Sequence, residues 1–303
     1  MSRSLVVVNP AAGGGRGAER WKALETWAGT LADFDVAVAP GPGATREAVL
    51  RAVAGGCERV VSFGGDGTAH LVGGALLASG VAARVTLGIV PAGTGSDLAR
   101  ALGVPRDPRA ALPRALLGPP TAIDAGRCDT AAGSSYFANI ASAGISGLVD
   151  EKVNAVADRG ATAFLRATLA ALREYRCVPV AVALDGKPWF EGPMLVLAVA
   201  NGTTFGKGMR VAPTARLDDG LFDVVLAGEL TRAPIAVLLP RLYVGRHLGS
   251  RHVRHARASR VTVRPLAPLP VFDMDGEPYD SCEAEFTVLP AALRVAGEPA
   301  PRR

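Results

Sequence analysis

The sequence predicts two domains of different class, an N-terminal α/β domain followed by a β-rich domain. Through the first 120 residues, short β-branched runs alternate with segments rich in Ala, Leu and Arg, which is the pattern of a parallel α/β fold. After "LLGPP", residues 116–120, the pattern changes to alternating strands. The 303 residues are enough for two domains that each bury a hydrophobic core.

Four apolar runs are the expected strands of the first domain, and a glycine-rich turn follows each. The runs are apolar on both faces, as strands are when helices cover both sides of a parallel sheet. Because the carboxyl ends of parallel strands share one edge of the sheet, we expect the turns to converge on a ligand there. The strands and turns are residues 4–8 with "NPAAGGGRG", 34–39 with "PGPG", 59–63 with "GGDGT", and 85–90 with "PAGTGSD".

The second domain is expected to consist mainly of strands, at residues 136–145, 178–186, 194–202 and 221–228. Two segments interrupt this pattern. Residues 150–176, rich in Ala, Leu and Arg, predict a helix, and residues 236–257 are rich in Arg and His.

Composition excludes several classes of protein. With 49% hydrophobic and 20% charged residues the chain is not disordered, and its apolar runs are too short to span a bilayer. We interpret "MSRSLVVVNP" as a first strand and not a signal peptide, and so expect a cytoplasmic protein. The four cysteines include no C-x-x-C pair, which argues against zinc and against a disulfide framework. The net charge of +5 favours anionic partners.

The glycine-rich turns are suited to phosphate. A turn from a buried strand into a helix leaves backbone N–H groups unpaired, and these act together with the positive end of the helix dipole. The alternative is that Gly64, Gly65 and Gly67 form only a tight turn. Asp66 would repel a phosphate unless it held a cation or ordered the N–H groups of the loop.

Two common nucleotide motifs fit less well. Gly13, Gly15 and Ala18 satisfy G-x-G-x-x-A, but the second strand ends in Ala39 and Pro40, where a dinucleotide fold would place an acid. The chain contains no G-x-x-x-x-G-K-[ST], which excludes a P-loop.

Two acidic turns occur in the second domain. In "TARLDDGLFDVV" an acidic pair beside glycine could offer oxygen atoms to a hard cation, or form a plain hairpin turn. In "VFDMDGEPYD", Asp275 and Glu277 flank a glycine and could both be presented at a cleft, although Asp-Gly turns are common without function.

Five stretches together resemble the soluble diacylglycerol kinase family of bacterial lipid kinases, whose catalytic domain is shared with sphingosine and ceramide kinases. They are "VVNPAAGGGRG", "GGDGT", "PAGTGSDLAR", "LDDGLFDVVL" and "DMDGEP", in this order. GGDGT alone also occurs in NAD kinases and phosphofructokinases, but the five in order are specific and cover nearly the whole chain.

The resemblance implies the fold of NAD kinases and diacylglycerol kinases, a Rossmann-like α/β nucleotide-binding domain with a C-terminal β-sandwich domain. The ATP-binding domain would be residues 1–122 with the returning tail 286–303, and residues 123–285 would form the lipid-substrate domain.

The resemblance also implies site residues. Asp275 or Glu277, not distinguished by the sequence, would accept the proton of the substrate hydroxyl, with Asp66 at the reacting end. A structural Mg²⁺ would be held by the Asp219 carboxylate and by the carbonyls of Arg216 and Leu221. The residues expected to bind ATP are Asn9, Pro10, Ala11, Ala12, Gly13, Gly64, Gly65, Asp66, Gly67, Thr68, Gly93 and Thr94.

The expected function is that of an ATP- and Mg²⁺-dependent lipid kinase, which transfers the γ-phosphate to a hydroxyl of diacylglycerol or a related lipid. Ala39 stands where the family usually has threonine, Leu71 where it usually has glutamate, and Ser96 where asparagine is commoner. The alternatives are an NAD kinase and a non-catalytic regulator that binds nucleotide or lipid. A homodimer is compatible with the sequence.

Residues 241–260 hold six arginines together with His247, His252 and His255. We expect this basic segment to make peripheral contact with the anionic inner face of the membrane, the alternative being a solvated helix and loop. Nucleic acid is a poorer partner, because Tyr243 is the segment's one aromatic residue for stacking.

Overall fold

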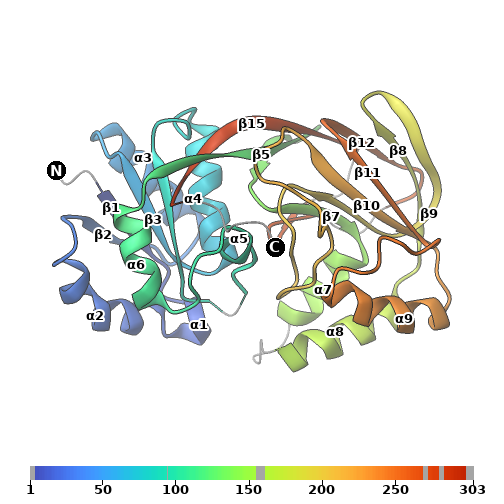
Figure 1. The fold of residues 1–303 in the computed structure, drawn as a ribbon, viewed down its shortest axis with the longest axis horizontal. Coiled ribbons are helices and arrows are strands. Elements are labelled where there is room, and N and C mark those ends of the chain that lie inside the picture. Colours follow the sequence, from blue (N-terminus) through green and yellow to red (C-terminus); the bar gives the residue numbers. More distant parts are fainter. Residues whose placement is uncertain (1–3, 94, 155–160, 269–271, 280–282, 298–303) are drawn as a thin grey trace. The chain divides into compact units, whose positions relative to one another are not determined.

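The computed structural model describes residues 4–93, 95–154, 161–268, 272–279 and 283–297. The chain divides into two compact units; in Figure 1 the first is coloured from blue to green with a red C-terminal segment, and the second from green to red. Unit 1 comprises Met1–Ala125 and Pro290–Arg303, and unit 2 comprises Gly126–Leu289. Unit 1 is α/β and unit 2 is rich in antiparallel strands, as predicted.

Unit 1 is built on a parallel sheet with the order β15-β4-β3-β1-β2. Its central strands are continuous apolar runs because both faces are covered, and Val6, Val7 and Val8 of β1 are fully buried. The strands are β1 (Ser4–Val8), β2 (Asp35–Val38), β3 (Arg59–Gly64), β4 (Thr86–Pro91) and the C-terminal part of β15 (Ala284–Ala296).

In the described part of unit 1, six helices connect and cover these strands. α3 begins with proline, whose fixed φ suits the first helical position, and α4 is buried along most of its length because it lies against β3 and β4. α2 contacts α6, and α3 contacts α4. The helices are α1 (Ala12–Gly15), α2 (Gly17–Ala28), α3 (Pro42–Ala54), α4 (Asp66–Ala78), α5 (Asp97–Ala101) and α6 (Pro108–Leu117).

Unit 2 is antiparallel, with the order β14-β13-β7-β9-β8-β12-β15, and β10 pairs with both β9 and β11. β5 begins in unit 1 and pairs in unit 2 with β6. The strands are β5 (Pro120–Thr130), β6 (Gly133–Phe137), β7 (Ile140–Gly144), β8 (Val178–Leu184), β9 (Lys187–Ala200), β10 (Phe222–Gly228), β11 (Val253–Ala258), β12 (Arg260–Pro265), β13 (Phe272–Met274) and β14 (Glu277–Tyr279).

Alternation along the strands gives unit 2 two apolar faces. Leu197 and Val199 of β9 enter a core in which three ring contacts connect four phenylalanines, whereas Ala198 and Ala200 face a second cluster. The helices α7 (Ile145–Asn154), α8 (Ala161–Glu174) and α9 (Arg232–Tyr243) lie together beside the strands of this unit (Figure 1).

Two expected elements differ from the structure. The helix expected over residues 150–176 corresponds to α7 and α8, and residues 155–160 lie outside the described part. The strand expected over 136–145 is divided into β6 and β7. The division has a long-range cause, because the backbone N–H groups of residues 138–140 bind the side chain of Asp275.

Candidate functional site

Asn9 joins the first and third glycine-rich turns of unit 1. Its Nδ2 donates to Thr68 Oγ1 at 2.9 Å, and its Oδ1 accepts the N–H of Ala11 at 2.9 Å. The backbone N–H of Asn9 donates to the Phe63 carbonyl at 3.1 Å. The turn after β1 is thereby fixed to the start of α4.

Arg20, which sequence reasoning missed, ties the first turn to the fourth. Its Nη1 donates to the Ala92 carbonyl at 2.9 Å. Gly13 has a φ of +61°, and a Cβ there would lie 2.5 Å from Arg20 Nη1 and 2.7 Å from the Ala92 oxygen. Only glycine fits this position without rearrangement. A lone arginine on a helix has no motif that would have predicted this contact.

The third and fourth turns touch backbone to backbone. A Cβ on Gly93 would lie 2.7 Å from Gly65 Cα, and a Cβ on Gly64 would lie 2.2 Å from Thr68 Oγ1. By contrast, a Cβ on Gly41 or Gly43 of the second turn would have no heavy atom within 4 Å. The structure therefore brings together the turns after β1, β3 and β4, which we call the turn junction.

Asp66 orders the fourth turn. Its carboxylate accepts the backbone N–H groups of Ser96, Asp97 and Leu98, the last two at 2.7 and 3.3 Å. Ser96 has a left-handed φ of +76°, which turns its N–H toward the carboxylate. Burial, together with the negative charge of Asp97, raises the pKa of Asp66 to about 7. Of the two roles considered for Asp66, the geometry favours ordering the N–H groups of the loop.

The start of α4 in the turn junction is partly open to solvent. The first turn of a helix leaves N–H groups without a helical acceptor, and Gly65, Asp66 and Gly67 are only half-buried. Of the other expected ATP contacts, Ala11 is exposed and Pro10 half-buried, whereas Ala12 is buried. Thr94 lies outside the described residues.

Asp275 in unit 2 is buried and fully engaged. Its two oxygens accept three backbone N–H groups, those of Ala138, Asn139 and Ile140, at 2.9, 3.0 and 2.9 Å. Its own N–H donates to the Ile140 carbonyl at 2.9 Å, and its φ is +56°. Asp275 therefore fixes the loop between β6 and β7.

Glu277 differs from Asp275 although two residues separate them. It begins β14 and is half-buried. Within the described part of the chain, no hydrogen bond or ion pair engages its carboxylate. The sequence could not separate these two acids, whereas their surroundings do.

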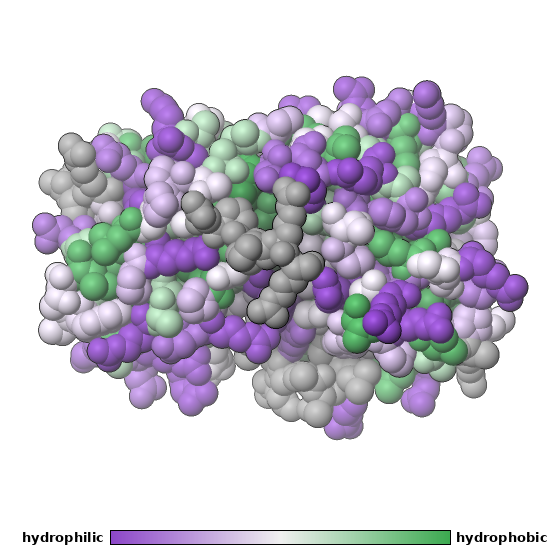
Figure 2. All heavy atoms as spheres, viewed as in Figure 1, coloured by the Kyte–Doolittle hydropathy of each residue, from purple (hydrophilic) through white to green (hydrophobic). Residues whose placement is uncertain are grey.

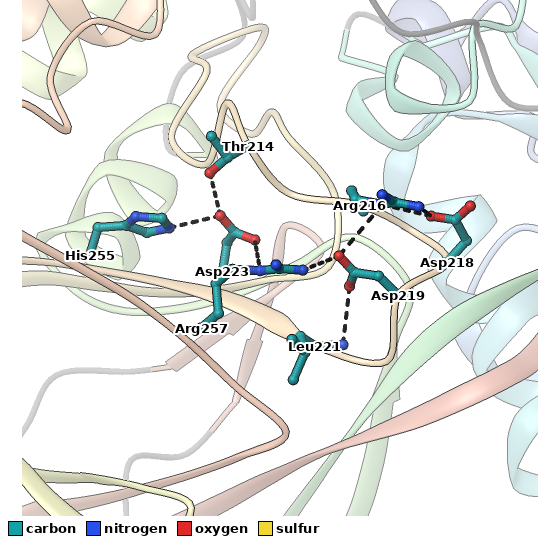
Figure 3. Close-up of polar contacts among 8 residues, drawn as sticks. All are labelled: Thr214, Arg216, Asp218, Asp219, Leu221, Asp223, His255 and Arg257. Carbon is teal, nitrogen blue, oxygen red and sulfur yellow. Dashed lines mark hydrogen bonds and ion pairs between the residues drawn. The ribbon is translucent and has the colours of Figure 1, made fainter.

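The expected magnesium ligands lie in the acidic turn, residues 214–223, shown in Figure 3. Asp219 Oδ1 accepts the Leu221 N–H at 3.2 Å. Asp219 Oδ2 binds Arg257 Nη2 and lies 3.6 Å from Arg216 Nε. Both carboxylate oxygens thus already face N–H groups, and two of the neighbours are cations. Among the described residues, no cluster of three or more His, Cys, Asp or Glu side chains could hold a metal. At Asp219, the expected carboxylate ligand, two guanidinium groups lie where Mg²⁺ would have to approach.

Several charges of the basic segment are used within unit 2. His255 Nε2 lies 2.8 Å from Asp223 Oδ1, and the guanidinium of Arg254 lies 5.6 Å from the centre of the Phe190 ring. His247 is buried against the Val211 carbonyl, and burial lowers its pKa. Arg251 remains exposed.

No helix within the described residues is both long and apolar enough to cross a bilayer. On the face shown in Figure 2, hydrophobic residues form small patches separated by hydrophilic ones.

Two family models match the chain. The model "Diacylglycerol kinase catalytic domain" matches residues 3–128, and the model "YegS C-terminal NAD kinase beta sandwich-like domain" matches residues 139–297. Together they cover both units and confirm the predicted fold class, including the β-sandwich character of unit 2.

Curated relatives and a solved structure agree with these matches. A "Diacylglycerol kinase" of Mycobacterium tuberculosis (strain ATCC 25618 / H37Rv) is 32% identical over 82% of this chain and 80% of its own length. A "Probable lipid kinase YegS-like" of Pseudomonas putida is 34% identical over 88% and 87%. A crystal structure of a diacylglycerol kinase from Bacillus anthracis has a TM-score of 0.72 and 20% identity over 98% of this chain and 97% of that one, a likeness of fold. The resemblance inferred from the five motifs is confirmed, and the chain belongs to the diacylglycerol kinase family of lipid kinases.

Proposed function

We propose that this protein is an ATP-dependent kinase that phosphorylates a hydroxyl group of diacylglycerol or a related lipid. The observation that carries the proposal is the turn junction, where Gly13, Gly64 and Gly93 leave no room for a Cβ. Backbone packed this closely at a helix start suits the phosphates of a nucleotide. Membership of the family supports a lipid as the acceptor.

The turn junction would bind the phosphates, with Asn9 and Asp66 as positioning residues. Asn9 holds the first turn to Thr68, and Asp66 holds residues 96–98. Phosphoryl transfer requires mainly positioning and neutralisation of charge, so turns fixed in advance lower the barrier. Mg²⁺ would enter with ATP and neutralise part of the charge on the phosphates.

Glu277 is our candidate for the general base and Asp275 for a positioning residue. A general base needs a carboxylate oxygen that can receive a proton. The three hydrogen bonds that backbone N–H groups donate to Asp275 favour its ionised form and would oppose protonation. Glu277 would take the proton of the lipid hydroxyl, while the oxygen of that hydroxyl forms a bond to the γ-phosphorus. The bond from that phosphorus to the β–γ bridging oxygen breaks, and ADP leaves.

Glu277→Gln is expected to lower kcat by roughly a hundredfold or more while ATP binding and the thermal midpoint stay near those of the wild type. Asp275→Asn is expected to lower both activity and the thermal midpoint. The asparagine amide has an acceptor oxygen at one end only, so it cannot accept all three hydrogen bonds that the two oxygens of Asp275 accept. Glu283→Gln, at an exposed glutamate of unit 2, is the matched control. Full activity in Glu277→Gln would refute the assignment of the base.

Transfer of label from γ-labelled ATP to a panel of acceptors tests the function itself. The panel contains diacylglycerol, phosphatidylglycerol, a polyprenol and a sphingoid base, each in mixed micelles, and NAD without lipid. We expect label in diacylglycerol or a related lipid. Label in NAD would identify an NAD kinase, and ATP binding without transfer to any acceptor would identify a regulator; either result would overturn the proposal.

A further inference from the structure

Asp223 in the acidic turn is a fully buried carboxylate. Its Oδ1 accepts the Thr214 hydroxyl at 2.5 Å and lies 2.8 Å from His255 Nε2. Its Oδ2 is buried without a hydrogen bond, and Arg257 Nε lies 3.6 Å from it. A charge taken out of water is strongly destabilising unless an opposite charge accompanies it. Asp223 therefore depends on a cation close by.

The fold supplies that cation from the neighbouring strand. Asp223 of β10 and Arg257 of β11 are directly opposed in the antiparallel register. The Arg257 guanidinium binds Asp219 through Nη2 and approaches Asp223 through Nε, as Figure 3 shows. The Asp219 side chain is 13% exposed and that of Asp223 is 0% exposed. One guanidinium thus serves two carboxylates that are shielded from water.

We propose that Arg257 is the built-in counter-cation of the acidic turn, and that this turn folds without a bound divalent metal. Mg²⁺ requires near-octahedral oxygen ligands at about 2.0–2.1 Å. At Asp219, a metal that close would meet the guanidinium groups of Arg257 and Arg216. Like charges at such distances repel, whereas the Arg257 guanidinium donates an N–H to Asp219 and places its positive charge 3.6 Å from Asp223 Oδ2.

The proposal does not rest on kinase activity, because it concerns the stability and metal binding of unit 2. It also separates Arg257 from any membrane contact of the basic segment, since its charge is neutralised within the unit. Arg254 of the same strand is a matched control. It is exposed and stacks on Phe190, so its loss removes one positive charge and leaves the acidic turn intact.

Metal binding by the wild type is the first test. In the absence of nucleotide, the thermal midpoint is measured with excess EDTA and with millimolar MgCl₂, and bound Mn²⁺ is counted by electron paramagnetic resonance. We expect the same midpoint under both conditions, and equal Mn²⁺ binding by the wild type and Asp219→Asn. A lower midpoint in EDTA, or a Mn²⁺ site that disappears in Asp219→Asn, would overturn the proposal.

Substitution of the arginine is the second test. Arg257→Gln is expected to lower the thermal midpoint by roughly 5 °C or more, and Arg254→Gln by about 2 °C or less. Hydrogen exchange should become faster in β10 and β11 of Arg257→Gln only. Equal midpoints and exchange rates in the two variants would refute the role of Arg257. If Arg257→Gln is recovered unfolded, Arg257→Lys is measured in its place. The lysine keeps the positive charge but not the planar guanidinium, so hydrogen exchange in β10 and β11 should be faster than in the wild type.

Discussion

Single carboxylates carry much of the specificity of this structure, and they do so by accepting backbone N–H groups. Asp66 fixes residues 96–98, Asp275 fixes residues 138–140, and Asp185 accepts the N–H groups of Ser259 and Arg260. In each case a side chain orders a loop distant in sequence. A short motif such as GGDGT marks where the acid lies but does not say which loop it will hold.

The stability of the protein should carry a pH dependence from Asp66. Its pKa is raised to about 7 from 3.8, so the folded state favours the protonated form. The resulting stabilisation is complete at pH values below the pKa of Asp66 in the unfolded chain. It is lost as the pH rises through the pKa of Asp66 in the folded protein. The unfolding free energy of the wild type minus that of Asp66→Asn should therefore fall from about pH 4 to about pH 7.

Urea unfolding of both proteins at several pH values measures this difference, and subtraction removes the contributions of all other titrating groups. Asp33→Asn, at an exposed aspartate of unit 1, controls for the loss of one negative charge. If the wild-type value minus the variant value stays constant or rises with rising pH, the raised pKa of Asp66 is contradicted.

At the scale of elements, the turn junction depends on the absence of side chains. Gly93→Ala would place its Cβ 2.7 Å from Gly65 Cα, so one backbone must move. We expect a loss of about 1–3 kcal/mol in unfolding free energy, as in other overpacked sites, and weaker ATP binding. Gly41→Ala meets no atom within 4 Å and has extended backbone, so it should be neutral or stabilising.

Urea unfolding and calorimetric titration with ATP compare these two glycine variants. If Gly93→Ala matched Gly41→Ala in both measurements, the close approach of the two turns would have no energetic weight.

The sequence predicted strands and turns well because their signals are local. Continuous apolar runs indicate covered parallel strands, and glycines after them indicate turns, as β3 and Gly64 illustrate. What it could not predict are contacts set by the fold: the bond from Arg20 to the fourth turn, the division of β6 from β7 by Asp275, and the pairing of Arg257 with Asp219. The last pairing joins residues far apart in sequence, so the acidic turn alone indicated a metal site.

At the scale of the whole molecule, the end of the chain completes the first unit. β15 begins within unit 2, where it pairs with β12, and ends within unit 1, where Arg294 and Val295 pair with β4. The Arg294 N–H donates to the Ala82 carbonyl at 3.0 Å, and Arg114 Nε donates to the Ala296 carbonyl at 3.1 Å. The sheet of unit 1 therefore cannot be completed until the last strand has been synthesised.

Leu293 should reveal how strongly unit 1 depends on this strand. The residue is fully buried, so Leu293→Ala removes packed methyl groups and is expected to lower the unfolding free energy by about 2–5 kcal/mol. Leu117→Ala is the matched control, because the same substitution falls at a leucine of unit 1 that is 56% exposed, and it should cost less than about 1 kcal/mol. Urea unfolding followed by the fluorescence of Trp21, which is buried in unit 1, reports on that unit. Equal losses in the two variants would show that β15 adds little to unit 1, and the return of the chain would then have to be explained by something other than stability.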